Sequence, residues 1–92
     1  MIKGFADRLT ERLFQDKPVP RYGQIERVAR RKLLYLHSAR SLNDLRLPPG
    51  NRLEALKGDR AGQHSIRIND QWRICFRWES GNACEVEIVD YH

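Results

Sequence analysis

Basic side chains gather in the second half of this 92-residue sequence, ahead of a run of residues that can hold or move protons. The basic residues are Lys57, Arg60, Arg67 and Arg73, and the run is Asp90, Tyr91 and His92. Arginine forks match the oxygens of a phosphate group, and histidine exchanges protons near neutral pH. The combination favours a phosphodiester as the group on which this protein acts.

Cleavage of RNA without a metal requires three kinds of side chain, and the cluster contains candidates for each. A base removes the proton of the 2′-hydroxyl, cations stabilise the charged phosphorane, and an acid protonates the leaving 5′-oxygen. The candidate base, cations and acid are, in that order, Glu54 or Asp90, Lys57 and Arg73, and His92. Spacing alone does not assign these roles. Tyr91 either stacks on a substrate base or packs near the C-terminus.

Alternating apolar residues after Gly50 predict two β-hairpins, with turns at 69–70 and 80–82. The predicted pairs are Ile68 with Trp72, Ile66 with Ile74 and His64 with Phe76, then Trp78 with Cys84, Phe76 with Val86 and Ile74 with Ile88. Paired residues share one face of a sheet. The hairpins therefore present an apolar face to the core, and both tryptophans belong to it.

The same register puts Arg67 directly opposite Arg73 on the other face of the sheet. The other expected neighbours on that face are Ser65 opposite Cys75, Arg77 opposite Glu85, and Glu87 near Cys75. Like charges in direct opposition are destabilising by about 0.2 to 1 kcal/mol, so the pair requires an anionic neighbour or ligand. Either nearby carboxylates neutralise the arginines in a solvated network, or Arg60 and Arg67 bind RNA beside the reacting phosphate.

Two helices are predicted before the hairpins. The first spans 7–14, and the second spans 22–39, where apolar residues recur every three or four positions. Met1 to Phe5 is expected as an edge strand. Arg30 and Arg31 belong to a basic group on the second helix, which is either a solvated face or an RNA-contacting stripe. Helices packed on one face of a small, twisted, mainly antiparallel sheet give an α+β fold.

Composition points to a single domain over residues 1–92. The net charge of +5 attracts phosphate polymers or an acidic partner. No segment reaches the roughly 20 apolar residues that span a bilayer, and the N-terminus lacks the apolar core of a secretory signal. We therefore expect a cytoplasmic protein with no membrane partner. Cys75 and Cys84 lack the spacing of a zinc site, so we expect no metal and no cofactor.

Four segments of the second half carry a resemblance to a known family. They are Asn51-Arg52-Leu53-Glu54, Leu56-Lys57-Gly58-Asp59-Arg60, the run from Gly62 to Arg73, and the ending Asp90-Tyr91-His92. This pattern resembles the HigB toxins of the RelE/ParE superfamily. The resemblance implies a RelE-like fold and a ribosome-dependent messenger-RNA endoribonuclease, the toxin of a type II toxin-antitoxin system. It places Arg73, Asp90, Tyr91 and His92 at active-site positions.

The resemblance also implies partners: the ribosome and its messenger RNA, and a HigA-like helix-turn-helix antitoxin whose complex with the toxin binds operator DNA. Some members have histidine at the position of Glu54 and asparagine at that of Gln71, so the identity of the base stays open. Two other functions are compatible with the fold. One is a gyrase-directed, ParE-like toxin, against which the acid-base run at 90–92 argues. The other is a non-catalytic module that binds RNA or the antitoxin in operon autoregulation.

Overall fold

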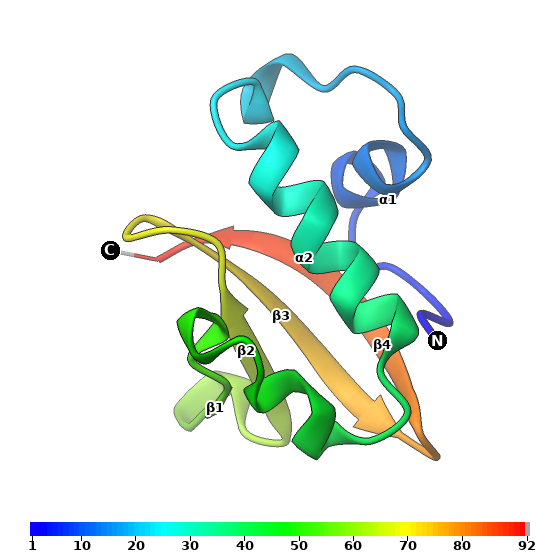
Figure 1. Cartoon of the computed structure of the whole chain (residues 1–92), viewed down its shortest axis with the longest axis vertical. Coiled ribbons are helices and arrows are strands. Elements are labelled where there is room, and N and C mark those ends of the chain that lie inside the picture. The colour runs from blue at the N-terminus through cyan, green and yellow to red at the C-terminus, as the bar shows by residue number, and fades with distance from the viewer. Residues whose placement is uncertain (92) are drawn as a thin grey trace.

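The computed structural model describes residues 1–91 as a four-stranded antiparallel sheet with two α-helices on one face (Figure 1). The elements are α1 (Arg8–Phe14), α2 (Glu26–Ser38), β1 (Glu54–Ala55), β2 (Gln63–Arg67), β3 (Trp72–Glu79) and β4 (Asn82–Asp90). The strands lie in the order β1-β2-β3-β4. The predicted α+β architecture is confirmed. Within this range no helix is long and apolar enough to cross a bilayer.

Short 3₁₀ turns occupy the connections between these elements. They span Pro20–Tyr22, Leu42–Arg46, Pro49–Asn51 and Gly58–Arg60. The Asp7 side chain accepts a hydrogen bond from the backbone N of Thr10 at 2.9 Å and so caps α1. α2 begins at Glu26 rather than at the predicted Tyr22, because Pro20 starts a separate 3₁₀ turn ahead of it. The boundary error is local and leaves the predicted helix in place.

The core lies between the helices and the apolar face of β2, β3 and β4. Ala29, Leu33 and Leu36 of α2 are fully buried, and they share one cluster with Ile66 and Ile74. The first hairpin has the predicted register, with His64 opposite Phe76, Ile66 opposite Ile74 and Arg67 opposite Arg73. Because side chains alternate across a strand, this register sends the arginines to the face that the helices leave uncovered.

The second hairpin departs from the predicted register near its turn. Ile74 pairs with Ile88 and Cys75 with Glu87 as expected. Trp78 pairs with Ala83 rather than Cys84, and Arg77 pairs with Cys84 rather than Glu85. A β-bulge causes the shift: β4 carries one extra residue opposite 75–77, and Glu85 takes a left-handed backbone with φ 51°. Ala83 is therefore the residue buried in the core.

The N-terminal residues run beside β4 without forming the predicted edge strand. Two isolated parallel bridges join Ile2 to Ala83 and Phe5 to Val86. The bridged residues are three apart on both segments, since the bulge in β4 interrupts the two-residue repeat that a continuous ladder needs. The segment still covers the outer edge of β4.

Candidate active site

Arg73 of β3 is held on the uncovered face of the sheet by uncharged oxygens, the most distant of which is the Ser65 carbonyl, 3.5 Å from Nη2. Its Nε donates to the Oγ of Ser65 at 2.7 Å, and its Nη2 donates to the carbonyl oxygen of Arg52 at 2.8 Å. The guanidinium carbon lies 5.7 Å from the centre of the Tyr91 ring, a cation-π distance. Bonds at two nitrogens fix the orientation of the guanidinium without neutralising its charge.

The other arginines of this face are paired with carboxylates. Arg60 pairs with Glu87, Arg67 with Asp70, and Arg77 with Glu85. Within residues 1–91 no carboxylate pairs with Arg73. The expected neutralising network therefore exists, but it leaves out the residue at its centre. A site that attracts an anion results at Arg73.

Arg60 bonds to residues of two strands on this face, β2 and β4. Its Nη1 donates to Glu87 Oε1 at 2.8 Å and to Gln63 Oε1 at 3.0 Å. The hydrogen bond to Glu87 raises the pKa of Arg60, so it stays charged. Below it lies Cys75, which is fully buried, and burial raises the pKa of this thiol. Cys75 is a packing residue beneath the site, since a buried protonated thiol is a poor nucleophile.

Glu54 reaches the same face from its β1 edge, and Lys57 follows that strand in the chain. Glu54 pairs with Ser65, the residue that accepts the hydrogen bond from Arg73 Nε, and it is exposed to solvent. Lys57 is exposed and directly precedes the 3₁₀ turn that carries Arg60. The structure thus places a carboxylate and an arginine next to Ser65.

The end of β4 brings Tyr91 to Arg73, whereas Asp90 lies on the face of the sheet that carries Trp72. Asp90 pairs with Trp72 in the β3–β4 register, and its carboxylate accepts a hydrogen bond from Gln71 Nε2 at 3.2 Å. The backbone N of Tyr91 donates to the carbonyl of Gln71. Tyr91 is 39% exposed, so its ring is open to a ligand. His92, the candidate acid, lies outside the described residues.

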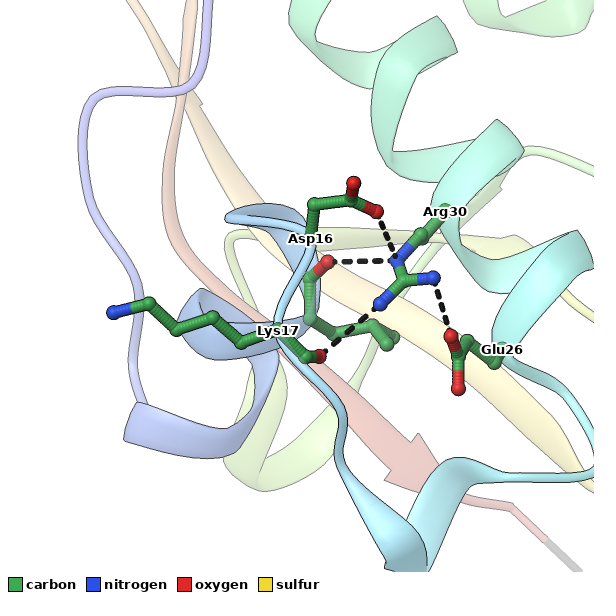
Figure 2. Close-up of polar contacts among 5 residues, drawn as sticks. Asp16, Lys17, Glu26 and Arg30 are labelled. Carbon is green, nitrogen blue, oxygen red and sulfur yellow. Dashed lines mark hydrogen bonds and ion pairs between the residues drawn. The ribbon is translucent and has the colours of Figure 1, made fainter.

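Arg30 and Arg31 lie on α2, which covers the opposite face of the sheet, so the structure does not bring them to Arg73 (Figure 1). Figure 2 shows how Arg30 is used. Its guanidinium pairs with Glu26 and Asp16 and donates to the carbonyls of Leu13 and Lys17, both at 3.1 Å. Arg30 joins the end of α1 to α2. Arg31 is exposed.

Two groups that position Arg73 were not among the candidate residues. Ser65 was expected on this face, diagonal to Arg73. A long side chain reaches its diagonal neighbour across two strands, so the Ser65 hydroxyl could have been identified as a hydrogen-bond partner of Arg73. The Arg52 carbonyl had no such signal, because it reaches Arg73 only through a left-handed backbone at Arg52, with φ 45° and ψ 57°. Gln71, named only as a departure from a family pattern, is the partner of Asp90.

Comparison with known proteins gives consistent matches. Residues 3–92 match the family described as the RelE-like toxin of type II toxin-antitoxin system HigB. The sequence is 42% identical over 85 residues to Toxin HigB-1 of Vibrio cholerae, covering 90% of each chain. It is 44% identical over 41 residues to Endoribonuclease HigB of Proteus vulgaris, covering 45% of each chain.

Among solved structures, a chain of the YoeB-YefM complex from Staphylococcus aureus superposes with a TM-score of 0.59. The match covers 100% of this chain and 98% of that chain at 16% sequence identity. At that identity the likeness shows a shared fold.

Proposed function

This chain belongs to the HigB-like toxins, the RelE-like toxins of type II toxin-antitoxin systems, and we propose that it arrests growth by cutting messenger RNA on the ribosome. RNA cleavage is the activity for which the Proteus vulgaris relative, Endoribonuclease HigB, is named. The observation that carries the proposal is Arg73, which neutral oxygens hold in place beside the Tyr91 ring. Its charge is available to an anionic ligand, and a phosphodiester supplies one.

The reaction is an in-line attack of a ribose 2′-oxygen on the adjacent phosphorus. The bond from the 2′-oxygen to phosphorus forms, and the bond from phosphorus to the 5′-oxygen breaks, which leaves a 2′,3′-cyclic phosphate and a 5′-hydroxyl. Arg73 and Lys57 stabilise the charge that builds on the phosphorane oxygens. Tyr91 stacks on a neighbouring base of the message.

Two carboxylates compete for the role of base that takes the 2′-proton, Glu54 on β1 and Asp90 at the end of β4. Glu54 is exposed and lies next to Ser65, whereas Asp90 is bonded to Gln71. Because a base must reach the hydroxyl that it deprotonates, the exposed Glu54 is the stronger candidate. His92 returns a proton to the leaving 5′-oxygen.

Partners follow from the same proposal. Arg60 and Arg67 extend the positive face around Arg73 and contact the RNA backbone, and Arg31 on α2 is a candidate contact to ribosomal RNA. Arg30 is not retained as a contact, since its donors are bound within the protein. The inhibitor is an antitoxin, as the toxin-antitoxin family and the YoeB-YefM neighbour support. We propose a HigA-like antitoxin that brings the cytoplasmic complex to operator DNA.

The test is cleavage of a defined message by the purified protein, with and without translating ribosomes. Arg73→Ala is the test variant, and Arg77→Ala is the matched control, because Arg77 lies on the same strand and face but is paired with Glu85. We expect cuts that require ribosomes, a loss of about 100-fold or more for Arg73→Ala, and near-native cleavage for Arg77→Ala.

Each other outcome points elsewhere. An intact message in every lane, with growth arrest retained in cells, favours a gyrase-directed toxin. Arg73→Ala with unchanged cleavage removes the observation on which the active site depends. RNA or antitoxin binding with neither cleavage nor growth arrest indicates a non-catalytic module.

A further inference from the structure

A buried lysine on α2 has no part in the chemistry described so far. Lys32 is 7% exposed, and its Nζ donates to Asn51 Oδ1 at 2.6 Å while lying 5.5 Å from the centre of the Tyr35 ring. An ammonium group is costly to bury unless it has polar partners. Burial lowers the pKa of Lys32, and the nearby charges of Arg31 and Arg67 lower it further. The role of Lys32 therefore depends on the polar group to which its ammonium is bonded.

Asn51 is the residue that it holds, and Asn51 organises the segment leading into β1. The Asn51 side chain is fully buried, and its Nδ2 donates to the carbonyls of Leu45 and Leu47 at 3.1 and 3.2 Å. One asparagine thereby ties α2 to two 3₁₀ turns. The partners of its side chain, Lys32, Leu45 and Leu47, all precede the sheet in the sequence.

The next residue along the chain touches the active site. Arg52 adopts the left-handed backbone, with its N–H donating to the Pro49 carbonyl at 3.1 Å. Its own carbonyl accepts the hydrogen bond from Arg73 Nη2 at 2.8 Å. A left-handed non-glycine residue persists only where its surroundings hold it. The bonds of Asn51 supply that restraint one residue away.

We propose that Lys32 and Asn51 are positioning residues for RNA cleavage: through Asn51 the buried ammonium of α2 fixes the Arg52 carbonyl, and that carbonyl sets the orientation of Arg73. The inference rests on the proposed role of Arg73. Without the Arg52 carbonyl, Ser65 would hold Nε at 2.7 Å and leave Nη2 with only a long contact of 3.5 Å to the Ser65 carbonyl. The second anchor at Nη2 fixes its plane before substrate arrives, and such preorganisation is what phosphorane stabilisation requires.

The test variant is Lys32→Met, which keeps the length and apolar stem of the side chain and removes the donor. Ala29→Gly is the control, because it weakens the same helix at a buried position without touching the link. At saturating concentrations of programmed ribosomes we expect kcat of Lys32→Met to fall about tenfold or more with KM within about twofold. Ala29→Gly is expected to retain the native kcat below its unfolding temperature.

A direct readout accompanies the kinetics. Nitrogen-15 NMR of the Arg73 guanidinium reports rotation about its Cζ–Nη2 bond, and we expect faster rotation in Lys32→Met but not in Ala29→Gly. If Lys32→Met does not fold, Lys32→Gln, with a shorter and uncharged donor, takes its place with an intermediate effect. This measurement needs no substrate, so it separates the link from the proposed function.

The outcomes are distinct. Unchanged Arg73 signals and unchanged kcat in Lys32→Met overturn the inference, even if Arg73→Ala abolishes cleavage. Altered Arg73 signals together with cleavage that does not depend on Arg73 overturn the proposed function and, with it, the positioning role. Equal loss of kcat in Lys32→Met and Ala29→Gly assigns the effect to helix stability and also contradicts the inference.

Discussion

Arg67 and Arg73 are direct partners in the pairing of β2 with β3, yet their guanidiniums end in different surroundings. Arg67 pairs with Asp70 in the hairpin turn. Arg73 turns toward Ser65 and the Arg52 carbonyl, both uncharged. The two like charges are thereby directed to different partners, and one of them stays available for an anion. The predictions below start from this difference.

Arg73→Lys is expected to lose nearly as much cleavage as Arg73→Ala. Lysine keeps the charge, but its ammonium cannot bond to Ser65 and Arg52 and also present a fork to phosphate. We expect a reduction of about 100-fold in single-turnover cleavage on ribosomes, with Arg77→Lys close to native. Near-native cleavage by Arg73→Lys would mean that charge alone suffices and that the two anchors do not matter.

Ser65→Ala is expected to slow cleavage while leaving the protein folded. The change removes the acceptor of Arg73 Nε from a fully buried site, and a lost hydrogen bond of this kind costs about 1 to 3 kcal/mol of stability. We expect about a tenfold decrease in the cleavage rate, because Arg73 then loses its Nε anchor and is held through Nη2 alone. Ser38→Ala, at the exposed end of α2, is the control. A native rate in Ser65→Ala would contradict the anchoring role.

Arg30→Ala and Arg31→Ala are expected to differ in stability, although the residues are adjacent. Arg30 bonds to two carbonyls and two carboxylates at the junction of α1 and α2 (Figure 2), whereas Arg31 is exposed. Urea unfolding should show a loss of about 2 kcal/mol for Arg30→Ala and under about 0.5 kcal/mol for Arg31→Ala. Equal losses would show that the network contributes little.

The two cysteines are expected to react at different rates with iodoacetamide. Cys75 is fully buried, and burial raises its pKa, whereas Cys84 is only half-buried. Mass spectrometry of the folded protein should find Cys84 labelled first and Cys75 labelled only on unfolding. Rapid labelling of Cys75 would reveal opening of the sheet face under the site.

The raised pKa of Cys75 also has a consequence for stability. The unfolded thiol ionises near pH 9, while the folded thiol keeps its proton to higher pH. The folded state then binds more protons than the unfolded state, so stability falls as pH rises above about 9. Cys75→Ala should reduce that slope in urea unfolding between pH 8 and about 10. An identical slope in both proteins would show that Cys75 does not contribute to it.

Local patterns in the sequence were sufficient for the elements and for one face of the sheet. Alternation from Ile66 to Ile74 defined the first hairpin, and three- and four-residue spacing defined α2. Both patterns follow from fixed repeats of strand and helix. They failed where the repeat is interrupted. The left-handed Glu85 adds a bulge residue that shifts the register of the second hairpin, and the 3₁₀ turn at Pro20 makes α2 begin later in the chain than predicted.

The sequence by itself determined that Arg67 and Arg73 share one face of a small sheet, because side-chain alternation is a property of neighbouring residues. Only the tertiary structure decided which arginine of this face has no carboxylate partner among residues 1–91. That choice depends on the Ser65 hydroxyl and the Arg52 carbonyl. Arg52 directly follows Asn51, whose side chain is hydrogen-bonded to Lys32. Contacts between residues far apart in the chain have no local period, so no pattern in the sequence records them.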